Sequence, residues 1–129
     1  MVDFSKTSKD RLNTCDPLLQ KLFNEVIKTY DCTVICGHRG EKEQNEAFEN
    51  GYSKLKFPKS KHNSIPSKAV DILPYPIKWN DKSRHLHFAG YVQATADRLG
   101  IKVRWGGNFD GDQNLDNGFM DRPHWELID

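Results

Sequence analysis

The chain has 129 residues, of which 36% are hydrophobic and 29% are charged, and its formal net charge is +1 at pH 7. This composition is typical of a globular chain that folds as one domain over residues 1–129, and it excludes an intrinsically disordered protein. A net charge this close to zero gives no electrostatic reason to expect binding to nucleic acid or to an anionic membrane.

The first predicted helix covers residues 16–29, where Asp16-Pro17 is suited to a first turn and two adjacent i, i+4 rows of apolar residues form one face. A strand follows at residues 32–36, which are rich in β-branched residues. Residues 41–50 read as a second helix, closed by Gly51. A basic loop with Pro58 and Pro66 then leads to the second half of the chain.

In that half, residues 69–73 are predicted to form a strand and residues 84–99 a third helix that stops at Gly100. The last two strands are expected at residues 101–105 and 124–128. Helices and strands are interspersed, but the connections are too irregular for a doubly wound sheet. We therefore expect an α+β fold with a small central antiparallel sheet and about three helices.

The N-terminal segment and the cysteines indicate where such a chain is made. Residues 1–13 are polar and contain no apolar core of a secretory signal, and no segment reaches the roughly 20 apolar residues that span a bilayer. Cys32 and Cys36 would lie about 13 Å apart on one strand, too far for a disulfide. With Cys15, three reduced thiols and synthesis in the cytoplasm are expected, without stable membrane insertion.

Three polar residues, one in a loop and two in predicted strands, form an arrangement that suits a catalytic metal. His62 lies in a loop, Asp71 enters the second strand, and His124 follows a short polar turn. A catalytic zinc ion takes three protein ligands and keeps one position open for water. Asp121, three residues before His124, is the natural general base for that water.

Plainer interpretations exist for each of these residues. His124 could cap the final strand, and Asp121 could be an ordinary turn residue. His85 and His87 compete as ligands, but they lie two residues apart on a helix and point in different directions, so we assign them to the surface or to packing. His38 lies beside Arg39, and its role is open.

The combined motifs resemble a known family. The series Ser60-x-His62, Ala69-x-Asp71 and Asp121-x-x-His124 is similar to the zinc D,D-peptidase family, which includes the vancomycin-resistance dipeptidases and carboxypeptidases. Residues 35–40, 59–72, 99–112 and 119–127 look like the phage endolysins of that family, which cleave the bond between L-alanine and D-glutamate in the wall peptide.

The resemblance implies a role for each matching position. It implies His62, Asp71 and His124 as ligands of one zinc ion and Asp121 as the base. Arg39 would hold the substrate carbonyl or carboxylate. The supporting residues would be Ser60 and Gln44. The gap between histidine and aspartate is longer than in the compact family pattern, and the base is Asp where many relatives have Glu.

The resemblance also implies a function and a setting. The fold would be that of hedgehog and the D,D-peptidases, and the chain would be a monomeric catalytic domain that hydrolyses peptidoglycan and lyses the host. It would be made in the host cytoplasm without a signal peptide and act on the wall after release, in a host with a thin wall. The alternatives are a D-alanyl-D-alanine carboxypeptidase and an inactive zinc-stabilised binding module.

A second metal site is predicted in an acidic segment. Asp110, Asp112, Asn114 and Asp116 place side-chain oxygens at alternate positions, as a calcium loop does. Position twelve of such a loop falls on Asp121, although position six is Leu115 where glycine is expected. The hypothesis is that calcium orders this loop and regulates the base; a solvated acidic turn is the alternative.

Overall fold

The computed structural model describes residues 2–106 and 122–128. Its elements are, in chain order, α1 (Lys6–Leu12), α2 (Pro17–Val26), β1 (Cys32–Cys36), α3 (Glu41–Glu49), the short 3₁₀ helix η1 (Lys61–Asn63), β2 (Ala69–Pro74), α4 (Lys82–Leu99), β3 (Val103–Trp105) and β4 (His124–Leu127). Within these ranges no helix combines the length and the apolar character that a membrane span requires.

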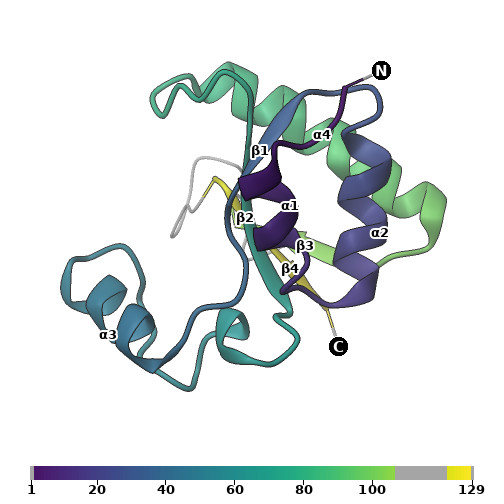
Figure 1. Cartoon of the computed structure of the whole chain (residues 1–129). Coiled ribbons are helices and arrows are strands. Elements are labelled where there is room, and N and C mark those ends of the chain that lie inside the picture. Colours follow the sequence, from purple (N-terminus) through teal and green to yellow (C-terminus); the bar gives the residue numbers. More distant parts are fainter. Residues whose placement is uncertain (1, 107–121, 129) are drawn as a thin grey trace.

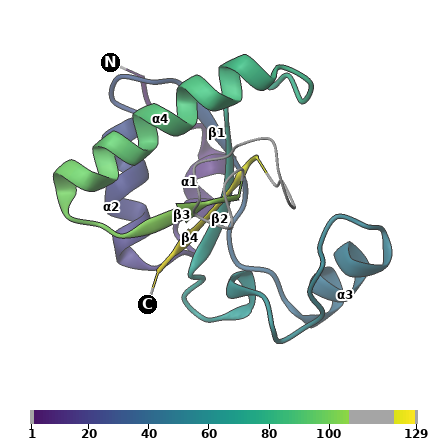
Figure 2. The same cartoon turned by 180° about the vertical axis from the view of Figure 1, so that it is seen from behind.

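The four strands form one antiparallel sheet in the order β1-β2-β4-β3. Figures 1 and 2 show α2 and α4 on one side of this sheet, whereas α3 stands apart on the other side. The expected α+β fold with a small antiparallel sheet is therefore confirmed.

The two long helices begin and end where local sequence chemistry dictates. Asp16 caps α2 by accepting a hydrogen bond from the Leu18 amide, and Pro17 occupies its first turn. The helix ends at Val26, three residues earlier than predicted. α4 ends at Leu99 and is capped by Gly100, whose φ of 72° is the left-handed conformation that glycine adopts without strain.

Helix α1 was not predicted, because its seven residues are polar and show no apolar period. Only Ser8 and Leu12 of this helix are buried, and the helix packs on the edge strand β1. The Ser8 hydroxyl accepts a hydrogen bond from the Val34 amide at 3.1 Å, and Arg11 donates to the Val34 carbonyl at 3.0 Å. α1 thus satisfies backbone groups that an edge strand would otherwise leave unpaired.

The central strands β2 and β4 separate the core from the site. Side chains alternate between the two faces of a strand, so every second residue points the same way. Val70 and Ile72 of β2, with Trp125 and Leu127 of β4, belong to the hydrophobic core. The residues between them, including Asp71, face the opposite side, where polar groups gather.

Candidate metal centre

Three residues from η1, β2 and β4 form a cluster that could hold a metal ion. One ligand atom from each of His62, Asp71 and His124 lies within 4.8 Å of the others. Asp71 and His124 are directly paired in the β2–β4 register. Such cross-strand partners have Cβ atoms about 5 Å apart, which brings together two residues distant in sequence. The structure therefore brings together the three residues that the sequence motifs predict as metal ligands.

The ring atoms that face the centre can be identified from the distances. His62 Nε2 lies 3.2 Å from Asp71 Oδ1, and His124 Nδ1 lies 3.3 Å from the same oxygen. The two ring nitrogens are 3.3 Å apart. The cluster thus presents two imidazole nitrogens and one carboxylate, with His62 and His124 only 2% and 7% exposed.

The backbone orients the His62 ring. Ser60 is the N-cap of η1, and its hydroxyl accepts a hydrogen bond from the His62 amide at 3.2 Å. His62 Nδ1 lies 2.7 Å from the carbonyl oxygen of Gly37, so this nitrogen carries the proton in a neutral ring and donates it to the carbonyl. The lone pair of Nε2 is then directed at the centre. Ser60, which the sequence analysis expects to be a supporting residue, thus contacts the backbone of His62.

A carboxylate that the sequence analysis did not single out contacts the second ring. His124 Nε2 lies 2.8 Å from Oε1 of Glu126, two residues further along β4. Residues i and i+2 of a strand share a face, so His-Trp-Glu in a strand of alternating pattern is the sequence signal that could have identified this pair. Metal-binding histidines commonly donate their outer N–H to such a partner.

Charge and burial act against each other in the metal-free cluster. Burial favours the neutral forms, but the hydrogen bond and charge of Asp71, together with the Cys36 thiol, raise the pKa of His62 to about 10. The pKa of His124 is raised in the same way, against burial, by Asp71 and Glu126. Burial likewise opposes ionisation of Asp71, yet hydrogen bonds from both histidines hold its pKa well below the usual range. The Asp71 carboxylate thus favours positive charge on the two neighbouring imidazoles.

The donor set fits a divalent zinc ion. Zinc binds imidazole nitrogen and carboxylate oxygen in tetrahedral sites and keeps one position open when it is catalytic. The three residues supply three such donors, and two of them line a pocket through which a fourth ligand could enter. The negative charge of Asp71 would also offset part of the charge of a buried divalent cation.

Arg39 lies beside the cluster in the loop between β1 and α3. Its NH2 group lies 3.4 Å from Asp71 Oδ2, and its NH1 group donates to Gln44 Oε1 at 2.9 Å. Gln44 is fully buried on α3 and donates to the Ser53 hydroxyl and the Leu55 carbonyl. Gln44 therefore connects Arg39 to the segment after α3.

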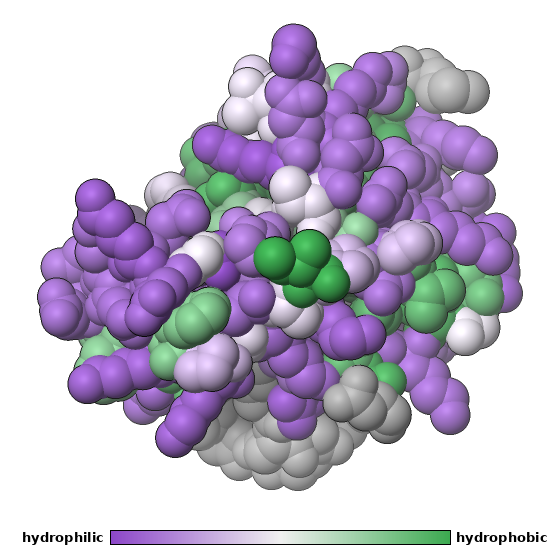
Figure 3. All heavy atoms as spheres, turned by 60° about the horizontal axis from the view of Figure 1, so that its bottom comes forward, coloured by the Kyte–Doolittle hydropathy of each residue, from purple (hydrophilic) through white to green (hydrophobic). Residues whose placement is uncertain are grey.

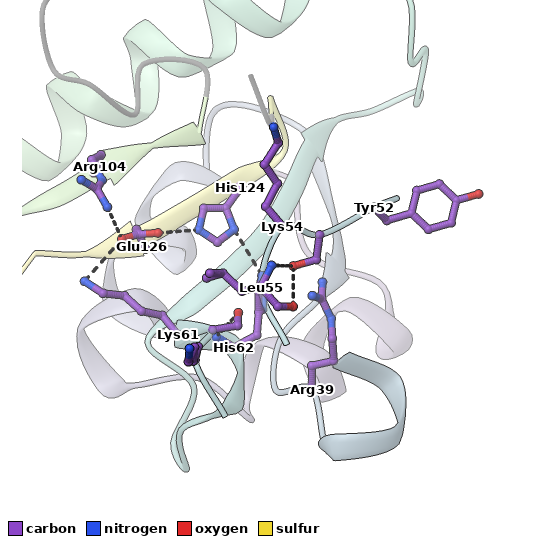
Figure 4. Close-up of a pocket in the computed structure, with 12 residues that line it drawn as sticks. Arg39, Tyr52, Lys54, Leu55, Lys61, His62, Arg104, His124 and Glu126 are labelled. Atoms are coloured by element: carbon purple, nitrogen blue, oxygen red, sulfur yellow. Dashed lines mark hydrogen bonds and ion pairs between the residues drawn. The ribbon is translucent and has the colours of Figure 1, made fainter. Parts of the chain in front are cut away.

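A pocket of about 460 Å³ opens onto the cluster. Figure 4 shows His124 between two walls, one carrying Lys61, Arg104 and Glu126 and the other carrying Arg39 and Tyr52. Among the described residues, the lining side chains include these cations: Arg39, Lys54, Lys59, Lys61 and Arg104. Figure 3 shows that the face at the bottom of Figure 1 is covered mainly by hydrophilic side chains, with small separated hydrophobic groups. The pocket thus offers cationic groups to an anionic part of a ligand.

The remaining histidines are not part of the cluster. His85 is buried on α4, and His87 is exposed and bonded to the Tyr30 hydroxyl at 2.8 Å. The His38 amide donates to Thr14 Oγ1. The proposed base Asp121 lies outside the described residues. The candidate calcium ligands Asp110, Asp112, Asn114 and Asp116 lie outside them as well.

Comparisons with known proteins identify the family of the chain. The family model for phage L-alanyl-D-glutamate peptidases matches residues 1–128. The crystal structure of the L-Ala D-Glu endopeptidase ChiX from Serratia marcescens is similar, with a TM-score of 0.76 and 25% sequence identity over 97% of this chain and 89% of that one. A search of curated proteins found no match. The expected family is confirmed: the chain belongs to the phage L-alanyl-D-glutamate peptidases.

Proposed function

We propose that the chain is a zinc metallopeptidase that hydrolyses the L-alanyl-D-glutamate bond in the stem peptides of peptidoglycan. The observation that carries this proposal is the cluster of His62, Asp71 and His124 beside a cation-lined pocket in a member of this peptidase family. Structural similarity to an endopeptidase named for the same bond supports it.

In this proposal the cluster holds one zinc ion through His62 Nε2, His124 Nδ1 and the carboxylate of Asp71. When bound, zinc supplies Lewis acidity toward the scissile carbonyl and lowers the pKa of water. Asp121 accepts the proton from the attacking water and passes it to the leaving amine of D-glutamate, as a general base and then a general acid. Its position three residues before His124 in the sequence supports this role.

Arg39 acts on the substrate rather than on the metal. Its guanidinium lines the pocket and lies against Asp71 and Gln44, which hold its planar group in one orientation. A guanidinium held in this way can donate two parallel hydrogen bonds to a carboxylate or polarise a carbonyl oxygen. The D-glutamate residue beyond the scissile bond carries such a carboxylate.

Digestion of purified peptidoglycan, followed by mass spectrometry of the products, tests the bond specificity. New L-alanine carboxyl ends, paired with new D-glutamate amino ends, are expected. Release of D-alanine would instead identify a D-alanyl-D-alanine carboxypeptidase, and intact peptidoglycan would identify an inactive binding module.

Two substitutions test the proposed roles. Asp121→Asn should retain zinc and abolish turnover, whereas His62→Ala should weaken zinc binding itself. Removing zinc with a chelator should abolish wild-type hydrolysis, and adding zinc back should restore it. Full activity of Asp121→Asn would contradict the assignment of the base.

The same proposal places the protein in phage-induced lysis. The enzyme would be made in the host cytoplasm, reach the periplasmic wall after release and act there as a monomer, which would make it antibacterial when applied from outside. To test host lysis, the wild-type chain and Asp121→Asn are each expressed together with a pore-forming partner. Only cells that express the wild-type chain should lyse.

A further inference from the structure

We propose that Glu126 is a positioning residue that directs Nδ1 of His124 at the metal, and that Arg104 and Lys61 hold Glu126 in place for this task. The inference rests on the proposed metal centre, and it assigns a function to three pocket residues outside the ligand set.

The first step is the contact between Glu126 and His124. Oε1 of Glu126 lies 2.8 Å from His124 Nε2, within hydrogen-bond distance, and both residues point to the same face of β4. The opposite ring nitrogen, Nδ1, lies 3.3 Å from Asp71 Oδ1. An ionised carboxylate can only accept hydrogen bonds, so the Nε2 proton stays on His124 and is donated to Glu126.

The second step is the choice between two ring forms. A neutral imidazole that keeps its proton on Nδ1 would donate to Asp71 and present no lone pair to a metal ion at this position. Glu126 opposes that form, because only a proton on Nε2 can satisfy its buried oxygen. With Nε2 held by Glu126, Nδ1 is the ring nitrogen that faces Asp71 and the centre, and the ring is already correctly oriented.

The third step is what holds Glu126 itself. Its side chain is only 9% exposed, and a buried carboxylate requires charged or hydrogen-bonding partners. Arg104 is its cross-strand partner in β3 and donates to Oε2 at 2.8 Å, while Lys61 Nζ lies 3.4 Å from the same oxygen. Two cations on one oxygen leave the other oxygen for His124.

The two histidines differ in a way that makes the idea testable. The outer nitrogen of His62 contacts a backbone carbonyl, that of Gly37, which no side-chain substitution removes. The outer nitrogen of His124 contacts a side chain. Substitution of Glu126 should therefore affect one ligand of the centre and leave the other two in place.

The test compares zinc affinity and ring chemistry in wild type, Glu126→Ala and Glu126→Gln. Zinc dissociation constants are measured by competition with a chromophoric chelator. Loss of such an outer partner typically weakens metal binding about 10–100-fold, and we expect this for Glu126→Ala. Glu126→Gln keeps a carbonyl oxygen that can accept from Nε2, so it should recover most of the affinity. Glu25→Gln, on the exposed side of α2, is the matched control.

¹⁵N NMR of the zinc-loaded wild type gives a readout that does not depend on the variants folding. We expect the His124 signals of a metal-bound Nδ1 and a protonated Nε2. Metal on Nε2, or unchanged zinc affinity in a folded Glu126→Ala, would overturn the inference. Neither measurement uses peptidoglycan, so wild type that binds zinc as expected but cleaves nothing would contradict the proposed function and leave this inference standing.

Discussion

Gly37 shows how a single residue links the fold to the metal centre. A Cβ atom at this position would lie 2.3 Å from the Arg11 carbonyl oxygen and 2.3 Å from Thr14 Oγ1. The carbonyl of Gly37 is also the acceptor that orients His62. Close packing against the end of α1 therefore fixes the position of a group that the metal ligand needs.

Gly37→Ala should accordingly disturb stability and zinc binding together. A carbonyl oxygen cannot rotate away from the new methyl group, so the backbone must shift, at a cost of about 1–3 kcal/mol. We expect a lower free energy of unfolding in urea and a weaker zinc affinity. Gly90→Ala, where an added Cβ meets nothing within 4 Å, is the control. Unchanged zinc affinity in Gly37→Ala would show that His62 is oriented by other contacts.

The raised pKa of His62 predicts how the metal-free protein responds to pH. Burial lowers this pKa, but Asp71 and Cys36 raise it from 6.5 to about 10. A group whose pKa is higher in the folded state than in the unfolded state stabilises the fold. This stabilisation is complete below the unfolded-state pKa, and it is lost as the pH rises toward the folded-state pKa. The chelator-treated protein should therefore lose stability from pH 6.5 upward.

Thermal unfolding between pH 6.5 and 9 measures this effect. The range ends at pH 9 because burial raises the pKa of Cys15 to about 12, which adds a further loss of stability above the ordinary thiol pKa of 9.0. The Tm of metal-free wild type should fall as the pH rises across this range. The Tm of His62→Gln should depend less on pH. Equal slopes for the two proteins would contradict the assigned protonation of His62.

At the scale of elements, α1 covers the outer edge of the sheet. β1 is an edge strand in the order β1-β2-β4-β3, and the polar side chains of α1 pair with the amide and carbonyl of Val34. A polar helix can therefore stabilise a sheet by hydrogen bonds to an edge strand, without burying much apolar surface.

Ser8→Ala tests this role of α1. The Val34 amide is buried beneath the helix, and leaving it without an acceptor costs about 1–3 kcal/mol. Chemical unfolding should show this loss, whereas Ser83→Ala on an exposed turn of α4 should change stability by less than about 0.5 kcal/mol. A Ser8→Ala protein as stable as wild type would mean that water replaces the hydroxyl.

α3 contributes to the site through one buried side chain. Gln44 joins Arg39 to the chain after α3. Gln44→Ala should release the guanidinium from its fixed orientation and reduce kcat/KM about 10–100-fold while zinc affinity is retained. Gln93→Ala, at a surface contact with Asp97, is the control. A loss of zinc in Gln44→Ala would instead place this residue in support of the metal.

At the scale of the molecule, the centre joins segments that are far apart in the chain. Its members come from η1, β2 and β4, so a bound ion would link the two central strands to the loop that precedes them. A ligand that binds only the folded state stabilises it by mass action.

Zinc at about 100 times its Kd should add about 2.7 kcal/mol and raise Tm by about 10 °C. Differential scanning calorimetry with and without zinc measures the shift. Asp71→Asn should lose most of it, and Asp97→Asn, on the exposed surface of α4, should retain it. A similar shift in both variants would mean that zinc binds elsewhere.

The sequence by itself determined the elements whose signals are local. β1 has the predicted bounds, α4 begins two residues before the predicted start, and the cap and proline of α2 mark its start. The three candidate ligands were identified because their residue types and order form a motif. Such features depend on neighbours in the chain, so they can be read without a structure.

Only the tertiary structure decided what depends on contacts between distant residues. α1 is too short and polar to be recognised alone, and its partner Val34 lies on another element. The buried carboxylate of Glu126 is paired with Arg104 and Lys61. The β3–β4 register places Arg104 next to it, and η1 carries Lys61. The physical reason is the same in both cases: a buried polar group is stable only with partners, and the fold supplies those partners.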